Sequence, residues 1–64
     1  MLLKGLVSSV NITNNTAEVI LPEYDSSLTC ELPLYNRRAE SLEIGEFVVV
    51  AVFDDEDICN GVIL

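Results

Sequence analysis

The chain contains no histidine and no tryptophan, and its three glycines stand apart from one another. Histidine is the commonest general base near neutral pH, so a nucleophile in this chain would lack its usual partner. The serines lie in turn-like stretches, and Gly5, Gly45 and Gly61 form no phosphate-binding loop. The sequence therefore predicts a protein that is not an enzyme, with no catalytic residues and no cofactor.

Positive charge is also scarce. Lys4, Arg37 and Arg38 are the only basic residues, and eleven acidic residues give the chain a net charge of −8. Proteins that bind a phosphate backbone do so by releasing counterions with lysine and arginine, and anionic membrane surfaces attract the same side chains. We therefore expect neither nucleic acid nor a membrane as a partner, whereas a basic protein partner stays open.

Long apolar stretches are missing too. The first seven residues are mostly apolar, but Lys4 and Gly5 interrupt them within a few positions. A membrane-spanning helix needs about 20 apolar residues, and a signal peptide needs an unbroken apolar centre. The sequence predicts no transmembrane segment and no secretion through a signal peptide.

Cys30 and Cys59 are the only cysteines. In a chain without a secretory signal such a pair is usually reduced and buried, and the alternative, a disulfide, requires that the two strands pair. A zinc site would lack ligands, because there is no histidine and no second cysteine pair. The acidic run from Asp54 to Asp57 does not follow the spacing of a calcium loop, so we interpret it as a solvated loop. Contact with a basic partner, or with a metal, is the alternative for that run.

Half of the residues are apolar, and seven of them are consecutive, from Phe47 to Phe53. Valine and phenylalanine favour a strand, and the run leaves no polar face. A domain of this size buries only about 60% of the surface of its unfolded chain. We therefore expect some apolar side chains to face another subunit.

The rest of the chain predicts four further strands. The first runs from Leu3 to Ile12 with a bend or bulge near Gly5, and a turn at residues 13–15 leads into the second, Thr16 to Leu21. In the second strand the core positions follow a period of two, and they are Ala17, Val19 and Leu21.

A loop follows in which Tyr24 is a candidate anchor. In the third strand the alternating positions Leu28, Cys30, Leu32 and Leu34 are expected to face the core. Residues 35–43 form either one short helical turn, with Asn36 as candidate N-cap, or an irregular loop, before the strand ending at Phe53. The fifth strand spans residues 58–64. Five short strands predict one all-β domain over residues 1–64, a small closed or half-closed antiparallel barrel.

Only one face of a strand in so small a barrel has an interior to enter. We predict that the inward face of the long apolar run consists of Phe47, Val49, Ala51 and Phe53. The other face then points outward, and with Ile20 from the second strand it forms the predicted interface, which consists of Val48, Val50, Val52 and Ile20.

Several motifs lie in an order that belongs to a known family. They are Gly5-Leu6-Val7, Ala17-Glu18-Val19-Ile20-Leu21-Pro22, Asp25 through Pro33, Ile44 through Phe53, and Gly61-Val62-Ile63-Leu64. Over nearly the whole chain this order resembles the oligonucleotide and oligosaccharide binding (OB) domain at the N-terminal side of phage tail hub and spike proteins, the baseplate assembly family. The resemblance implies a five-stranded OB-like barrel.

The same resemblance implies a non-catalytic structural protein of a phage or prophage virion, a tail hub, baseplate or related ring component. Its partners would be other virion or tail proteins and further copies of itself, with a trimer favoured, and it would be assembled in the host cytoplasm. Members of the family usually continue into a spike, whereas this chain stops at Leu64, which favours an accessory ring, adaptor or decoration piece.

Three other functions remain open at this stage. An OB-type barrel can be a ligand-binding module for single-stranded nucleic acid or a saccharide. A small acidic phage protein can also be a head decoration protein, or a host inhibitor that imitates DNA. Scattered acidic residues weigh against imitation of DNA, which requires charges spaced like phosphates.

Overall fold

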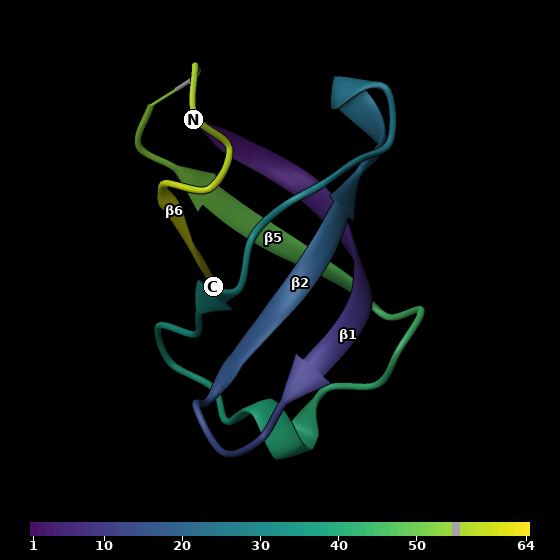
Figure 1. Cartoon of the computed structure of the whole chain (residues 1–64), viewed down its shortest axis with the longest axis vertical. Coiled ribbons are helices and arrows are strands. Elements are labelled where there is room, and N and C mark those ends of the chain that lie inside the picture. Colours follow the sequence, from purple (N-terminus) through teal and green to yellow (C-terminus); the bar gives the residue numbers. More distant parts are fainter. Residues whose placement is uncertain (55) are drawn as a thin grey trace.

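The computed structural model describes residues 1–54 and 56–64, and it is all-β. Its strands are β1 (Leu2–Asn11), β2 (Thr16–Leu21), β3 (Ser27–Leu28), β4 (Leu32–Pro33), β5 (Phe47–Val52) and β6 (Gly61–Ile63). Two short 3₁₀ turns, η1 (Pro22–Tyr24) and η2 (Ala39–Ser41), lie at opposite ends of the molecule (Figure 1). The described residues contain no α-helix, so the predicted fold class is confirmed.

The strands form one antiparallel sheet in the order β3-β2-β1-β5-β6, and β4 also pairs with β2. Because β3 and β4 are two parts of the predicted third strand, the six observed strands correspond to the five predicted ones. It curls into a half-barrel whose ends approach each other at β4 and β6 (Figure 1). There Leu34 forms a parallel bridge with Ile63, and the Tyr35 N–H donates to the Ile63 carbonyl at 2.8 Å.

The core lies inside the curl, where alternate residues of the strands meet. It consists of Leu3, Val7, Ala17, Val19, Leu21, Leu32, Leu34, Ala39, Leu42, Val48, Val50, Val52 and Ile63. The three predicted core residues of β2 are therefore confirmed. The predicted anchoring role of Tyr24 is also confirmed, because its ring packs against this core and its hydroxyl lies 3.4 Å from the Met1 sulfur.

The predicted orientation of β5 is wrong. The inward residues are Val48, Val50 and Val52, which are buried, whereas Phe47 and Phe53 are mostly exposed. The register explains this, because Val50 pairs with Leu3 and Val48 pairs with Gly5. Three of the four residues predicted as an interface thus belong to the core, and only Ile20 keeps partial exposure.

Gly5 shows why valines rather than phenylalanines face inward. A Cβ at Gly5 would lie 3.0 Å from Val19 Cγ1 and 3.2 Å from Val50 Cγ2, so these two valines already fill the interior above the glycine. An aromatic ring on the inner face of β5 would not fit there. The expected bulge near Gly5 is displaced as well, because the register of β1 with β2 shifts between Val7 and Ser9.

The third predicted strand changes face midway. Leu28 is exposed, whereas Thr29 is buried at 2% exposure and Leu32 is buried again. Thr29 is held by β2, because its Oγ1 accepts from the Val19 N–H at 3.1 Å and its own N–H donates to the Val19 carbonyl at 2.8 Å. Cys30 and Glu31 lie between the inward residues Thr29 and Leu32, and both are exposed. The predicted inward position of Leu28 and Cys30 is therefore wrong.

The cysteines form a disulfide between Cys30 and Cys59, with the two Cα atoms 5.1 Å apart. Both residues are exposed, so the expectation of reduced, buried thiols is wrong. The change of face in the third strand turns Cys30 outward, and the turn before β6 brings Cys59 beside it. The segments that carry the cysteines, the β3–β4 connection and the turn before β6, come together, although neither cysteine lies in a strand.

The helical turn expected between the third and fourth predicted strands is confirmed as η2, but its N-cap is Arg38 rather than Asn36. The turn after β1 holds η2 in place, because the Ala39 N–H donates to Asn15 Oδ1 at 2.7 Å. Asn15 has a φ of 56°, a left-handed conformation that asparagine tolerates better than most residues. The β1–β2 turn and η2 thereby close one end of the half-barrel.

Candidate interaction surface

The outward positions of β1 and β5 are mostly apolar. Successive side chains of a strand alternate between its two faces. Each outward residue of β1 therefore lies opposite an outward residue of β5, and each such pair forms a row across the sheet. The register pairs Leu2 with Ala51, Lys4 with Val49, and Leu6 with Phe47. Leu2 is 67% exposed and Phe47 is 56% exposed, which is high for side chains of this size.

The apolar surface continues onto β6 through Val62, which pairs with Ala51, and through Leu64, whose N–H donates to the Val49 carbonyl at 2.9 Å. We call this surface the outer face and define it as Leu2, Lys4, Leu6, Phe47, Val49, Ala51, Val62 and Leu64. A further row of residues continues from β1 across β2 to β3, because Leu6 pairs with Ile20 and Ile20 pairs with Leu28. Ile20 therefore borders the outer face, although it does not belong to it.

An open depression of about 710 Å³ lies in the outer face. Its lining is mostly apolar and consists of Leu2, Leu3, Lys4, Arg37, Phe47, Val48, Val49 and Leu64. The Lys4 Nζ lies 4.2 Å from the centroid of the Phe47 ring, which is a cation–π contact. Two of the three basic side chains of the chain therefore border this depression.

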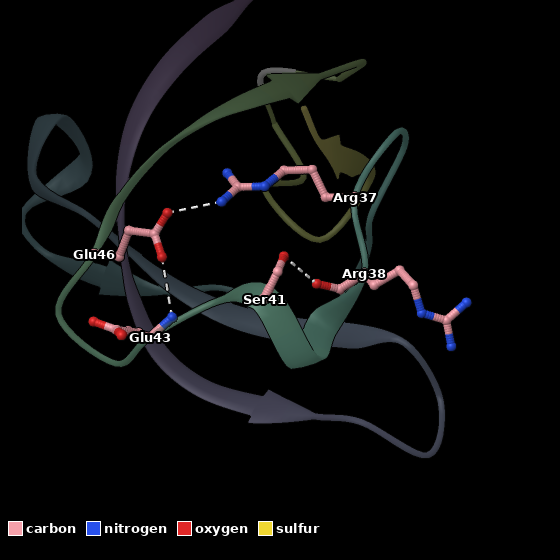
Figure 2. Close-up of polar contacts among 5 residues, drawn as sticks. All are labelled: Arg37, Arg38, Ser41, Glu43 and Glu46. Atoms are coloured by element: carbon pink, nitrogen blue, oxygen red, sulfur yellow. Dashed lines mark hydrogen bonds and ion pairs between the residues drawn. The ribbon is translucent and has the colours of Figure 1, made fainter.

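Arg37 is held at the border by an ion pair. Its Nη2 donates to Glu46 Oε2 at 2.7 Å, and the other Glu46 oxygen accepts the Glu43 N–H at 3.0 Å (Figure 2). In the same segment, Ser41 Oγ donates to the Arg38 carbonyl at 2.6 Å. The hydrogen bond from Arg37, followed by that from Glu43, lowers the pKa of Glu46 below its ordinary value.

We predict that Arg37→Ala raises the pKa of Glu46 toward its ordinary value, because the largest cause of the lowered pKa is removed. A carboxyl group with a lowered pKa in the folded state stabilises the fold above its unfolded pKa, and this contribution disappears as the pH falls through the folded pKa. The measurement is an NMR titration of the Glu46 side-chain carboxyl. Arg37→Lys is the control that keeps the charge and should retain part of the shift, and an unchanged midpoint in Arg37→Ala would contradict the assignment.

Lys4 in β1 is the sequence signal that indicates the outer face, and the long apolar run of β5 contains no such signal. Lys4 is the one charged residue of β1, and a lysine on a strand points to solvent, which assigns Leu2 and Leu6 to the same outward side. Once the register pairs Lys4 with Val49, the outward side of β5 follows. The alternation of β5 alone could not show it.

The acidic run supports no metal site in the part of the chain that the structure describes. Asp55 lies outside the described residues, and within residues 1–54 and 56–64 no group of three or more cysteine, aspartate or glutamate side chains is arranged to hold a metal ion. The carboxylates on either side cap local backbone. Asp54 Oδ1 accepts the Glu56 N–H and Asp57 Oδ1 accepts the Cys59 N–H, both at 3.0 Å.

The fold and the surface together define an all-β antiparallel half-barrel with an exposed apolar sheet face. Comparison of the chain with protein-family models, with curated proteins and with solved structures found no match. No helix in the described chain is long and apolar enough to cross a membrane. The relation to the baseplate assembly family remains a sequence-based expectation.

Proposed function

We propose that this protein is a non-catalytic assembly module that works by packing its outer face against further copies of itself and against other proteins. The observation that carries the proposal is the exposed apolar surface on β1, β5 and β6. Contiguous apolar surface of this kind is rare on monomers and marks interaction sites. An interface of ordinary size buries about 800 Å² per partner, roughly one fifth of the 3910 Å² accessible surface of this protein.

Charge supports the same location. Copies of a chain with a net charge of −8 repel one another over most of their surface. The outer face carries no carboxylate side chain, and its one charged side chain is Lys4, which lies over the Phe47 ring. Two copies therefore approach with the least repulsion through this face, and the acidic remainder of the surface keeps the assembly soluble.

The setting that we propose is a phage or prophage virion, as a tail hub, baseplate or related ring component. The support for this setting is the order of motifs that resembles the baseplate assembly family. The partners would be other virion or tail proteins, and a trimer is the assembly that the resemblance favours. Sequencing of the neighbouring genes is the direct test, and a neighbourhood without tail, baseplate or capsid genes would count against this setting.

The test of self-association is Val49→Asp. Val49 is 46% exposed at the middle of the outer face, so we expect the variant to remain folded and to weaken association about tenfold or more, since a buried charge at an interface centre is costly. Sedimentation velocity over a range of concentrations measures this effect. The matched control is Ile12→Asp, which places the same charge at an exposed apolar residue outside the outer face and should associate like the wild type.

The result that would overturn self-association is a wild-type protein that stays monomeric at the highest soluble concentration. Equal association of the Val49→Asp and Ile12→Asp variants would instead show that copies meet through another surface. Thermal melting of each variant is recorded in parallel and shows whether that variant is folded. A loss of association is therefore not mistaken for unfolding.

A ligand-binding module is the second candidate, because Lys4, Arg37 and the Phe47 ring border the depression. OB folds bind oligonucleotides and oligosaccharides mainly over the face of strands 2 and 3 and the loops beside it. The depression lies over β1, β5 and β6 instead, and Arg37 already pairs with Glu46. Fluorescence titration with oligonucleotides and oligosaccharides at low salt distinguishes the candidates, and tight binding would favour this second one.

A further inference from the structure

The sheet closes on itself at one weak place, the seam between β4 and β6. β1 pairs with β2 and with β5 along much of its length. Across the seam, by contrast, the connection consists of the parallel bridge of Leu34, the residue after β4, with Ile63 and the hydrogen bond from the Tyr35 N–H to the Ile63 carbonyl at 2.8 Å. Local opening begins where backbone pairing is sparse, so this seam is a place where the half-barrel separates readily.

The disulfide crosses the same seam. Cys30 lies in the connection between β3 and β4, and Cys59 lies two residues before β6. The Cys30 N–H also donates to Cys59 Sγ at 3.2 Å. Asp57 fixes the turn that carries Cys59, because its Oδ1 accepts the Cys59 N–H and its carbonyl accepts the Asn60 N–H, both at 3.0 Å. The covalent bond thus connects the two segments that lead into the two sides of the seam.

We propose that the Cys30–Cys59 disulfide is a redox-controlled clasp, and that a thiol reductant opens the seam between β4 and β6. Both cysteines are exposed, so a small dithiol reaches the sulfur atoms without prior unfolding. One thiolate of the dithiol attacks a cysteine Sγ, the Cys30–Cys59 bond breaks, and the released cysteine thiolate takes up a proton. The second thiol of the reductant then displaces the other cysteine, which leaves two cysteine thiols and the oxidised, cyclic reductant.

Opening the seam has a defined structural consequence. Ile63 loses its partner across the seam, and one edge of β6 then presents unpaired backbone groups, which readily accept another strand. The side chains of Leu32, Leu34 and Ile63, which are buried in the closed form, become accessible at the same place. The sheet formed by β2, β1 and β5 keeps its pairing, so the reduced protein remains folded.

The experiment compares backbone amide hydrogen exchange in the oxidised and the reduced wild-type protein, with tris(2-carboxyethyl)phosphine and dithiothreitol as alternative reductants. We expect the seam amide, Tyr35, to exchange at least about tenfold faster after reduction, relative to amides in the centres of β1 and β2. Thermal melting should fall by roughly 15–25 °C, because the bond closes a long loop in the unfolded chain. The Cys30→Ser, Cys59→Ser double variant should match the reduced protein and should not respond to either reductant.

Four results would overturn the proposal. The first is an equal rise in exchange at every amide, because the disulfide would then contribute only to global stability. The second is complete loss of protection on reduction, which would mean that the remaining sheet does not survive without the clasp. The third is the finding of two free thiols in protein purified without reductant under air. The fourth is unchanged exchange of the Tyr35 amide, because the seam would then stay closed after reduction.

Discussion

Val50→Asp should unfold the protein, whereas Val49→Asp, one residue earlier in β5, should leave it folded. Val50 has 0% exposure and lies between Leu3 of β1 and Ile63 of β6. An unpaired carboxylate at such a position costs several kcal/mol, about 3–5 kcal/mol when a buried charge has no partner. A core of this size rarely supplies more than about 3–5 kcal/mol, so the loss is comparable to the whole contribution of the core.

Val49 provides the matched control because it is the same residue type, in the same strand, on the other side of the sheet. In Val49→Asp the new carboxylate would be solvated. The loss in the free energy of unfolding would be limited to the lower strand preference of aspartate, about 1 kcal/mol. Far-UV circular dichroism with thermal melting separates the two variants. Similar melting of both variants would contradict the assignment of the valines of β5 to the two faces.

The second large effect concerns Gly61, where β6 begins. A Cβ at this position would lie 2.6 Å from the Ala51 carbonyl oxygen and 3.3 Å from the Val52 Cα. These are backbone atoms of β5, a strand that is paired on both sides, so they cannot move away as a flexible side chain would. We expect Gly61→Ala to cost about 1–3 kcal/mol through the forced shift of the backbone.

A loss of this size should lower the melting temperature by about 10 °C, and it should weaken the pairing of Val52 with residue 61. Differential scanning calorimetry measures the first effect, and hydrogen exchange of the Phe53 amide, which donates to the Asn60 carbonyl at 2.9 Å, measures the second. Val62→Ala is the control on the neighbouring, partly exposed residue and should cost less than about 1 kcal/mol. Wild-type melting of Gly61→Ala would show that β6 does not approach β5 this closely.

Local patterns were sufficient for much of the fold. The regular alternation of Ala17, Val19 and Leu21 predicted both the strand and its inward face, because polar neighbours distinguish the two sides. Turn residues located the β1–β2 connection. The short turn between the third and fourth predicted strands followed from the composition of residues 35–43.

The outer face could be predicted only in part from the sequence. A surplus of apolar residues predicted an exposed apolar surface, and Ile20 was assigned to the outside correctly, but the valines chosen beside it belong to the core. A run in which every residue is apolar has no contrast between its faces, so its orientation cannot be determined from the run itself. Register with Leu3 and Gly5 decided it.

The sequence by itself determined that the domain is all-β, the order of its strand-forming segments along the chain, the strongly negative charge and the presence of more apolar surface than a small core can contain. These properties are local or additive, so they can be derived residue by residue. Only the tertiary structure decided which face of β5 is buried, where the third strand changes face, and that Cys30 meets Cys59. Each of these depends on which residues lie opposite one another across strands distant in the chain, and close packing around Gly5 and Gly61 leaves room for one arrangement.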